Sequence, residues 1–294
     1  LRCLVGSEMC IRDSDYSKGV QALIWIISGT QDGRELGAEL ADRENLENPD
    51  ERKGILMTVV SQYGKVLAEH TGIDIEVGRF TKPDMVRIIH DKDIELIIDA
   101  SHPYAAIVSE TAFSACRETG IQYIRYERPE IPLPDYDKLY VVKDENEAAE
   151  LAGRLGNSIL LTTGSKTLST FVNSKALEGK EIWARVLPTS GVVKMCEELG
   201  MKAKNILAVQ GPFSYEMNMA MIHDYKADVL ITKNSGLVGG SDKKLEAAMS
   251  AGIAVIVIEK PKSVLTGVPV FNNTQDVLSY MEDHYGLYKE PKSN

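Results

Sequence analysis

The sequence predicts an α/β fold of two Rossmann-like parallel-sheet domains in tandem, with an active-site cleft between them. Three observations indicate this fold class. Short strand-like runs alternate with amphipathic helical runs, a proline-rich stretch interrupts the alternation once, and glycine-rich or polar segments follow most of the strand-like runs. The length of 294 residues suits two domains of about 130–150 residues each.

The first domain is expected over residues 23–130, where runs rich in β-branched residues alternate with helical patterns. The expected strands are Leu23–Ile27, Ile55–Val60, Ile73–Val77, Leu96–Asp99 and Gln122–Tyr126. The expected helices are Glu35–Arg43, Lys65–His70, Lys82–Asp91 and Ala105–Thr119. Thr81 and Pro83 support the third helix, because threonine caps helix N-termini and proline suits the first turn.

The second domain is expected over residues 138–288. Three prolines within residues 129–134 cannot continue a helix or a central strand, and they mark the linker before it. The expected strands are Leu139–Val142, Ile159–Thr162, Ile182–Leu187, Ile206–Val209, Val229–Thr232 and Ala254–Ile258. The expected helices are Glu145–Leu155, Gly191–Leu199, Tyr215–Asp224, Lys243–Ala251 and Thr274–His284.

Residues 1–14 are treated separately, because residues 4–14 (LVGSEMCIRDS) resemble the translation of a sequencing-library adapter. We expect a non-native leader there; a native disordered leader is the alternative, and a signal peptide is disfavoured because an apolar core is missing. Cys116 and Cys196 then remain, each within an apolar helical pattern and without CxxC spacing. They predict reduced core thiols in a cytoplasmic protein and no metal site.

Charge and hydropathy exclude two classes of function. The formal net charge is −10, and no block of lysine or arginine offers a basic face, so nucleic-acid binding is not expected. No run of 18 apolar residues occurs, so no membrane span is expected. A small anionic ligand stays compatible with this charge if a few cations converge in a cleft.

Four residues after the first strand predict a phosphate-binding turn: Gly29, Thr30, Gly33 and Arg34. Glycines at a strand-to-helix junction allow close backbone approach, and the helix N-terminus presents N–H groups to a phosphate. The spacing is GxxxG instead of the dinucleotide fingerprint GxGxxG, so an ordinary turn is an equal alternative.

The end of the second strand carries Ser61 and Lys65 and lacks the acidic residue that binds the ribose 2′-hydroxyl of NADH. These two residues weakly favour the 2′-phosphate of NADPH, with NADH as the alternative. A helix cap followed by a surface lysine explains the same pattern equally well.

The fourth strand is followed by Asp99-Ala-Ser-His102-Pro-Tyr104. His102 and Tyr104 are candidate catalytic acids, because an imidazole and a phenol at the cleft edge can supply a proton. A structural role, such as a helix cap, is the alternative for His102. Asp99 is equally consistent with a hydrogen-bond acceptor that orients this loop.

Loops after four strands of the second domain contain cations, glycines and hydroxyls, and they include Lys166, Arg185, Ser214, Lys233, Ser235 and Gly236. Strand ends of a parallel sheet meet at one edge. We therefore expect the cations to converge on carboxylates, with loop N–H groups assisting.

Several of these segments together resemble the precorrin-6A reductases and their cobalt-precorrin relatives, in order and at fitting spacing from about Ile24 to Pro261. The segments are Gly29-Thr30…Gly33-Arg34, DASHPYA from Asp99, YIRYERP from Tyr123, TGSK from Thr163, RVLPT from Arg185, QGPFS from Gln210 and KNSG…GG from Lys233. Many members carry a basic residue after the position of Ser61, whereas this chain has Tyr63 and then Lys65 there, so the choice between NADPH and NADH stays open.

The resemblance implies an NAD(P)H-dependent oxidoreductase of cobalamin biosynthesis that reduces one macrocycle double bond of precorrin-6A, or of its cobalt form, to the 6B compound. It also implies that Arg125 and Arg128 join the basic loops in holding the substrate's carboxylates. The proton donor stays open between His102, Tyr104 and water. Two other classes are weighed: a tetrapyrrole- or nucleotide-using transferase, and a non-catalytic nucleotide-binding sensor on the same fold.

Overall fold

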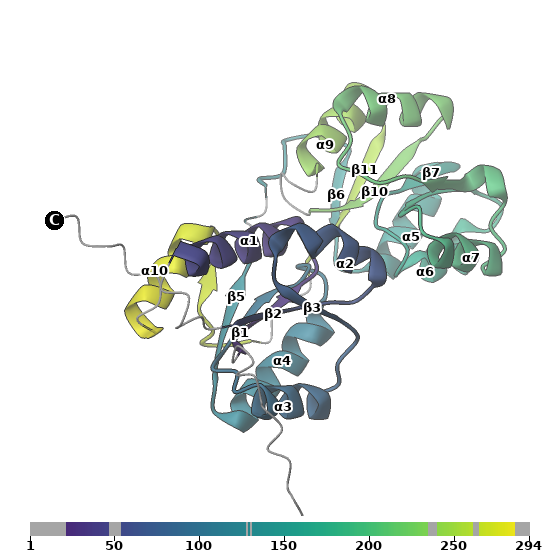
Figure 1. Cartoon of the computed structure of the whole chain (residues 1–294). Helices are drawn as coiled ribbons and strands as arrows, with labels where there is room; N and C mark the ends of the chain where they lie inside the picture. The colour runs from purple at the N-terminus through teal and green to yellow at the C-terminus, as the bar shows by residue number, and fades with distance from the viewer. Residues whose placement is uncertain are drawn as a thin grey trace, which may run out of the picture.

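The computed structural model describes residues 22–46, 54–127, 129, 131–234, 240–260 and 265–285. They form two α/β units, each built on a six-stranded parallel sheet with helices on both faces (Figure 1). The predicted fold class is confirmed. Within these residues, no helix is both long enough and apolar enough to cross a bilayer. The predicted leader, residues 1–14, lies outside the described residues.

The first sheet has the strand order β12-β5-β4-β1-β2-β3. Its first five strands along the chain are β1 (Ala22–Ser28), β2 (Gly54–Val59), β3 (Asp74–Val77), β4 (Leu96–Ala100) and β5 (Gln122–Tyr126). The helices between them are α1 (Gln31–Leu46), α2 (Gln62–Ala68), α3 (Lys82–Asp91) and α4 (Ala106–Thr119). Strand order reverses between β1 and β4, so their carboxyl ends form a switch point, where ligands bind in such sheets.

Alternation of buried side chains along β1 explains the two-sided cover of this sheet. Ile24 and Ile26 face a core shared with α1, whereas Trp25 and Ile27 face a second core shared with α3 and α4. Both cores are almost wholly apolar, as a parallel sheet buried on both faces requires. Cys116 of α4 lies in the second core as a free thiol, as the sequence predicted.

The second sheet has the order β6-β11-β10-β7-β8-β9, with its switch point between β7 and β10. Its strands are β6 (Leu139–Val142), β7 (Ser158–Leu161), β8 (Glu181–Val186), β9 (Ile206–Ala208), β10 (Val229–Lys233) and β11 (Ala254–Ile258). Its helices are α5 (Glu145–Leu155), α6 (Leu168–Val172), α7 (Ser190–Glu198), α8 (Tyr215–Asp224) and α9 (Ser241–Ser250). Helices α5, α6 and α7 cover one face, and α8 and α9 cover the other.

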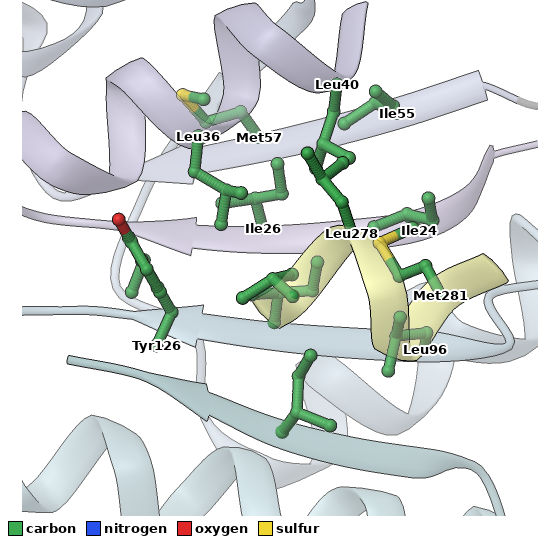
Figure 2. Close-up of a cluster of buried hydrophobic side chains, with 14 of the residues drawn as sticks. Ile24, Ile26, Leu36, Leu40, Ile55, Met57, Leu96, Tyr126, Leu278 and Met281 are labelled. Atoms are coloured by element: carbon green, nitrogen blue, oxygen red, sulfur yellow. The ribbon is translucent and has the colours of Figure 1, made fainter. Parts of the chain in front are cut away.

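The C-terminal segment returns to the first unit, which corrects the expected second domain of residues 138–288. Strand β12 (Val270–Phe271) pairs with β5 of the first sheet. Helix α10 (Thr274–Tyr285) buries Val277, Leu278 and Met281 in the first-unit core (Figure 2). The helix itself was expected at nearly these residues. Its amphipathic pattern shows that it must cover a sheet, but not which of two similar sheets it covers.

Candidate active site

A cavity of about 390 Å³ lies between the carboxyl ends of the two sheets, within the usual range for small-molecule sites. Its walls combine the end of β1 and the loop after β4 with loops of the second unit. From the first unit it is lined by Thr30, Gln31, Arg34, His102 and Pro103; from the second it is lined by Thr162, Gly164, Arg185, Val186, Leu187, Val209, Gln210, Gly211, Pro212, Phe213 and Lys244. We call this cavity the cleft.

The turn after β1 brings the start of α1 to the cleft. Thr30 caps this helix: its Oγ1 accepts from the Gly33 amide at 3.1 Å and donates to the Ala100 carbonyl at 3.1 Å. Gly33 is required here, because an added Cβ would lie 2.9 Å from the Ala100 Cβ and 3.2 Å from the Ala100 carbonyl oxygen. The glycine therefore allows α1 to approach β4 closely.

Gly29 and Ser28 leave unused room and an unused hydrogen-bonding group beside this helix start. A Cβ on the exposed Gly29 would meet nothing nearer than 3.4 Å, so the protein's own packing does not demand glycine. The buried Ser28 hydroxyl has no hydrogen-bond partner among the described residues. Arg34 donates to the Thr30 carbonyl at 3.1 Å, and burial lowers the pKa of its guanidinium although Glu35 and Asp32 raise it.

The structure does not bring Ser61 and Lys65 to the cleft lining. Ser61 is the N-cap of α2, with its hydroxyl accepting from the Gly64 amide at 3.1 Å, which is the alternative the sequence left open. Tyr63, between them, reaches across to the second unit, where its hydroxyl donates to the Gln210 side chain. This contact joins the two units beside the cleft.

Beneath the loop that carries His102 lies a buried ion pair. Arg125 contacts Asp99 at 2.7 Å and donates to the Ser101 carbonyl and hydroxyl, each at 2.9 Å. Asp99 also accepts from the Ser101 amide at 2.9 Å and from the Tyr123 hydroxyl at 2.6 Å. Burial alone would raise the pKa of Asp99, but the Arg125 charge and the hydrogen bonds from its neighbours hold that pKa below its ordinary value.

The predicted substrate contact of Arg125 is therefore corrected. Its side chain is only 7% exposed, lies outside the cleft lining and is further engaged by Glu127 at 3.1 Å. Glu127 in turn pairs with Lys260, which follows β11. Asp99 accepts from the Ser101 amide, as the loop-orienting role expected for it requires. YIRYERP looked like a basic substrate motif because the sequence does not show that Asp99 lies on the adjacent strand.

His102 and Tyr104 lie in different surroundings, and only His102 lines the cleft. His102 lines the cleft, and its Nδ1 accepts from the Tyr104 amide at 3.3 Å, which leaves Nε2 to carry the proton of the neutral ring. The Tyr104 hydroxyl donates to the Ile258 carbonyl of β11 at 3.0 Å, and the Lys233 ammonium lies 4.9 Å from the centre of its ring. The predicted acid role of Tyr104 is corrected, since its proton is held by the backbone of the other unit.

Among the predicted cations of the second unit, Arg185 lines the cleft. It donates to the Asn218 side chain at 2.8 Å, and its guanidinium lies 4.4 Å from the centre of the Phe213 ring. Burial lowers the pKa of Arg185 to about 10. Lys233 is instead paired with Glu145 at 3.0 Å and lies outside the lining, which corrects its expected carboxylate contact.

Of the other predicted substrate residues, Lys166 and Ser214 do not reach the cleft lining. Lys166 is exposed, although Gly164 of the same loop lines the cleft. Ser214 is the N-cap of α8, with its hydroxyl accepting from the Met217 amide at 3.2 Å. Three predicted residues lie outside the described residues: Arg128, Ser235 and Gly236.

One charged residue of the cleft lining escaped the sequence-based site prediction. Lys244 of α9 is 5% exposed, lines the cleft and donates from Nζ to the Thr232 hydroxyl at 2.9 Å. Burial, and then the Arg185 charge, lower the pKa of Lys244 to about 7. A signal existed: Lys244 falls on the same buried stripe of α9 as Leu245 and Ala248, where a lysine is unusual.

Two Rossmann-like units around a cleft, with a helix start and a histidine on one wall and Arg185 and Lys244 on the other, define a two-domain α/β protein with a cleft of the kind that enzymes of this fold use. Residues 23–282 match the family model of the precorrin-6x reductases, CbiJ/CobK. The chain belongs to this family, whose named activity is an oxidoreduction. The resemblance found in the sequence is confirmed.

Relatives agree with this assignment. A cobalt-precorrin-6A reductase of Priestia megaterium is 37% identical over 243 residues, 82% of this chain and 91% of the relative. That of Salmonella typhimurium is 37% identical over 245 residues, 83% and 89% of the two chains. The solved structure of CobK precorrin-6A reductase has a TM-score of 0.71 at 20% identity, covering 92% of this chain and all of that one, and so supports the fold.

Proposed function

We propose that this protein reduces one ring double bond of precorrin-6A, or of its cobalt form, to the 6B compound during cobalamin biosynthesis. Family membership supports a reductase that uses a nicotinamide cofactor and acts on a tetrapyrrole. The observation that carries the proposal is the cleft itself. Its second-unit wall holds Arg185 and Lys244 without a carboxylate partner among the described residues, opposite the turn that starts at Gly29.

The nicotinamide cofactor fits the first-unit wall. The start of α1 would hold its phosphates through backbone N–H groups, with Thr30 and Arg34 beside them. The exposed backbone at Gly29, where no side chain stands between it and the solvent, suits a ligand that approaches the backbone closely. When bound, the cofactor supplies the hydride.

NADPH is the cofactor that we propose over NADH. The segment after β2 contains Lys65 and no aspartate or glutamate from Val60 to Ala68. In Rossmann-type sites this strand end meets the ribose 2′-position, so a cation without a nearby acid favours a 2′-phosphate. Lys65 does not line the cleft, and its contact with the phosphate would therefore lie at the outer end of the cofactor.

The substrate's carboxylates are proposed to meet Arg185 and Lys244, and its apolar ring is proposed to rest against Leu187 and Phe213 of the same wall. Fixing the macrocycle against the hydride donor lowers the barrier by positioning. His102, on the facing wall, is the proposed proton donor through Nε2, with water as the alternative. The cytoplasmic location and the absence of nucleic-acid partners stay predictions.

The test is a single-turnover assay of the purified full chain with NADPH or NADH, using precorrin-6A and cobalt-precorrin-6A in separate reactions. We expect loss of nicotinamide absorbance in step with a tetrapyrrole product heavier by two hydrogen atoms, and a lower KM for NADPH than for NADH. If neither nicotinamide is oxidised and S-adenosylmethionine or a nucleotide sugar binds instead, the reductase proposal is wrong and a transferase is favoured.

A further inference from the structure

The second-unit wall of the cleft contains two cations that lack a counter-charge. Lys244 and Arg185 both line the cleft, and neither forms an ion pair with any carboxylate in the part of the chain that the structure describes. Only 5% of the surface of Lys244 is exposed. A buried lysine without a carboxylate is rare, because desolvation penalises its charge.

The hydrogen bonds of Lys244 do not require that charge. Its Nζ donates to the Thr232 hydroxyl at 2.9 Å, and that hydroxyl donates onward to the Lys233 carbonyl at 3.3 Å. A neutral amine and an ammonium can both make the donation from Nζ. The threonine therefore positions the nitrogen at the cleft wall in either protonation state.

Arg185 is the charged group that opposes an ammonium at this position. It keeps its proton near neutral pH, since burial lowers its pKa only to about 10. Burial and the Arg185 charge together lower the pKa of Lys244 to about 7. Of the two cations, the lysine is thus the one that gives up its charge in the empty cleft.

Two of the lysines near Lys244 are paired with carboxylates of their own. Lys243 pairs with Glu246 at 3.0 Å, and Lys233 of β10 pairs with Glu145 of α5 at 3.0 Å. The other titratable groups on the packed elements and the facing wall are Asp242 on α9, Tyr215, Glu216, His223 and Asp224 on α8, Glu181 on β8, and Arg34 and His102 across the cleft. None of them offsets the effect of Arg185 on Lys244.

We propose that Lys244 is a proton-coupled anion receptor: above neutral pH it is mostly an uncharged amine in the empty cleft, and it becomes an ammonium when an oxyanion lies against it and Arg185. The ligand class is a carboxylate or a phosphate, which share this chemistry. The inference rests on the proposed function, which supplies two possible sources of the oxyanion: a carboxylate of the macrocycle and a phosphate of the cofactor. An anion within about 4–6 Å of an amine favours its charged form.

Protons taken up on binding measure this directly. Isothermal titration of the full chain in buffers of different ionisation enthalpy gives the number of protons bound with the ligand. The two probes are NADP⁺ and the octacarboxylate porphyrin uroporphyrin. We expect an uptake of about 0.8 proton at pH 8 and about 0.1 at pH 6, because Lys244 is mostly neutral at the higher pH and already charged at the lower.

The probe that shows the uptake identifies the oxyanion, a phosphate for NADP⁺ and a carboxylate for the porphyrin. Lys244→Met should abolish the uptake, and Lys243→Met, on the exposed side of the same helix, should retain it. Lys244→Arg, which keeps a permanent charge, should bind the ligand without uptake and serves if the methionine variant does not fold. Uptake that persists in Lys244→Met, or none with either probe, would overturn the proposal.

This measurement needs no turnover. Failure of the reductase reaction and failure of proton-coupled binding are therefore separate results.

Discussion

Replacing Arg125 by methionine tests whether the buried ion pair under the His102 loop has the role that its geometry indicates. The change leaves Asp99 fully buried, without its cation and still bonded to Tyr123 and the Ser101 amide. It also removes the two hydrogen bonds that hold the Ser101 carbonyl and hydroxyl. We expect both lower stability and a displaced loop.

The size of the stability loss follows from the charge left behind. A buried carboxylate without a cation escapes its penalty by taking up a proton, which at pH 7 costs about 4 kcal/mol for an ordinary pKa near 3.9, at about 1.36 kcal/mol per pH unit. This value caps the electrostatic part of the loss. Breaking one side of a buried ion pair typically costs about 3–5 kcal/mol, so the two arguments agree.

The loss should depend on pH in a definite direction. In the native protein the pKa of Asp99 is held below its ordinary value. The stabilising contribution of Asp99 is therefore fully present above the ordinary pKa, and it is lost as the pH falls from there through the lowered pKa of the folded protein. In Arg125→Met, burial dominates and raises the pKa of Asp99, so the penalty grows with pH above about 4. Between pH 7 and pH 5 the difference between the two proteins should shrink by about 2.7 kcal/mol at most.

Urea unfolding at the two pH values, followed by the fluorescence of Trp25 in a Trp183→Phe background, measures this loss in the first unit. Trp25 is fully buried in the first-unit core that also contains Tyr123, the residue bonded to Asp99, whereas Trp183 belongs to the second unit. A loss below about 1 kcal/mol at pH 7, or one independent of pH, would refute the reasoning, because the buried pair predicts about 3–5.

A conservative variant tests the effect of Arg125 on the position of the His102 loop separately from its effect on stability. Arg125→Lys keeps a charge for Asp99 but cannot bridge the Ser101 carbonyl and hydroxyl with one planar group. We expect stability near that of the native protein with kcat lowered about 10- to 100-fold, since small misplacements at a site have effects of this size. Normal kcat in Arg125→Lys would show that the bridge to Ser101 does not position the loop.

Three further predictions follow from single contacts. Gly33→Ala should destabilise the first unit in urea unfolding and Gly29→Ala should not, because only a Cβ at position 33 would come within 3.0 Å of neighbouring atoms. Equal losses of stability in the two variants would contradict this packing argument. Leu278→Ala should cost about 2–5 kcal/mol of first-unit stability and Ser279→Ala almost nothing, and a small loss for Leu278 would show that α10 does not complete that core. Arg185→Met should raise KM for the tetrapyrrole at least tenfold, with unchanged NADPH affinity by fluorescence titration; the reverse would assign the guanidinium to the cofactor.

Local patterns in the sequence were sufficient for most elements of the fold. The apolar runs of β1, β4 and β11 are buried on both faces, and the amphipathic patterns of α3 and α5 expose one side, as predicted. Strand β12 escaped prediction because its two residues, Val270 and Phe271, carry no periodicity. Its pairing with β5 depends on a segment more than 140 positions away.

Cleft residues could be predicted from the sequence only where their place at the end of a strand is enough to bring them to the cleft. Arg34, His102 and Arg185 follow or end strands at the carboxyl edges of the sheets, and the structure brings all three to one cleft. Tyr104 and Lys233 meet the same positional criterion. They are engaged by groups of distant segments, Ile258 and Glu145, that the sequence does not place beside them.

The sequence by itself therefore determined two parallel α/β sheets, the sheet edge that borders the cleft, and the family. These follow from periodicity and motif order, which are local properties of the chain. Tertiary structure decided that α10 covers the first sheet, that Arg125 contacts the loop after β4 and that Lys244 faces the cleft with no carboxylate partner among the described residues. The physical reason is that a side chain's charge and role depend on its burial and on its neighbours, and both are supplied by residues far away in the sequence.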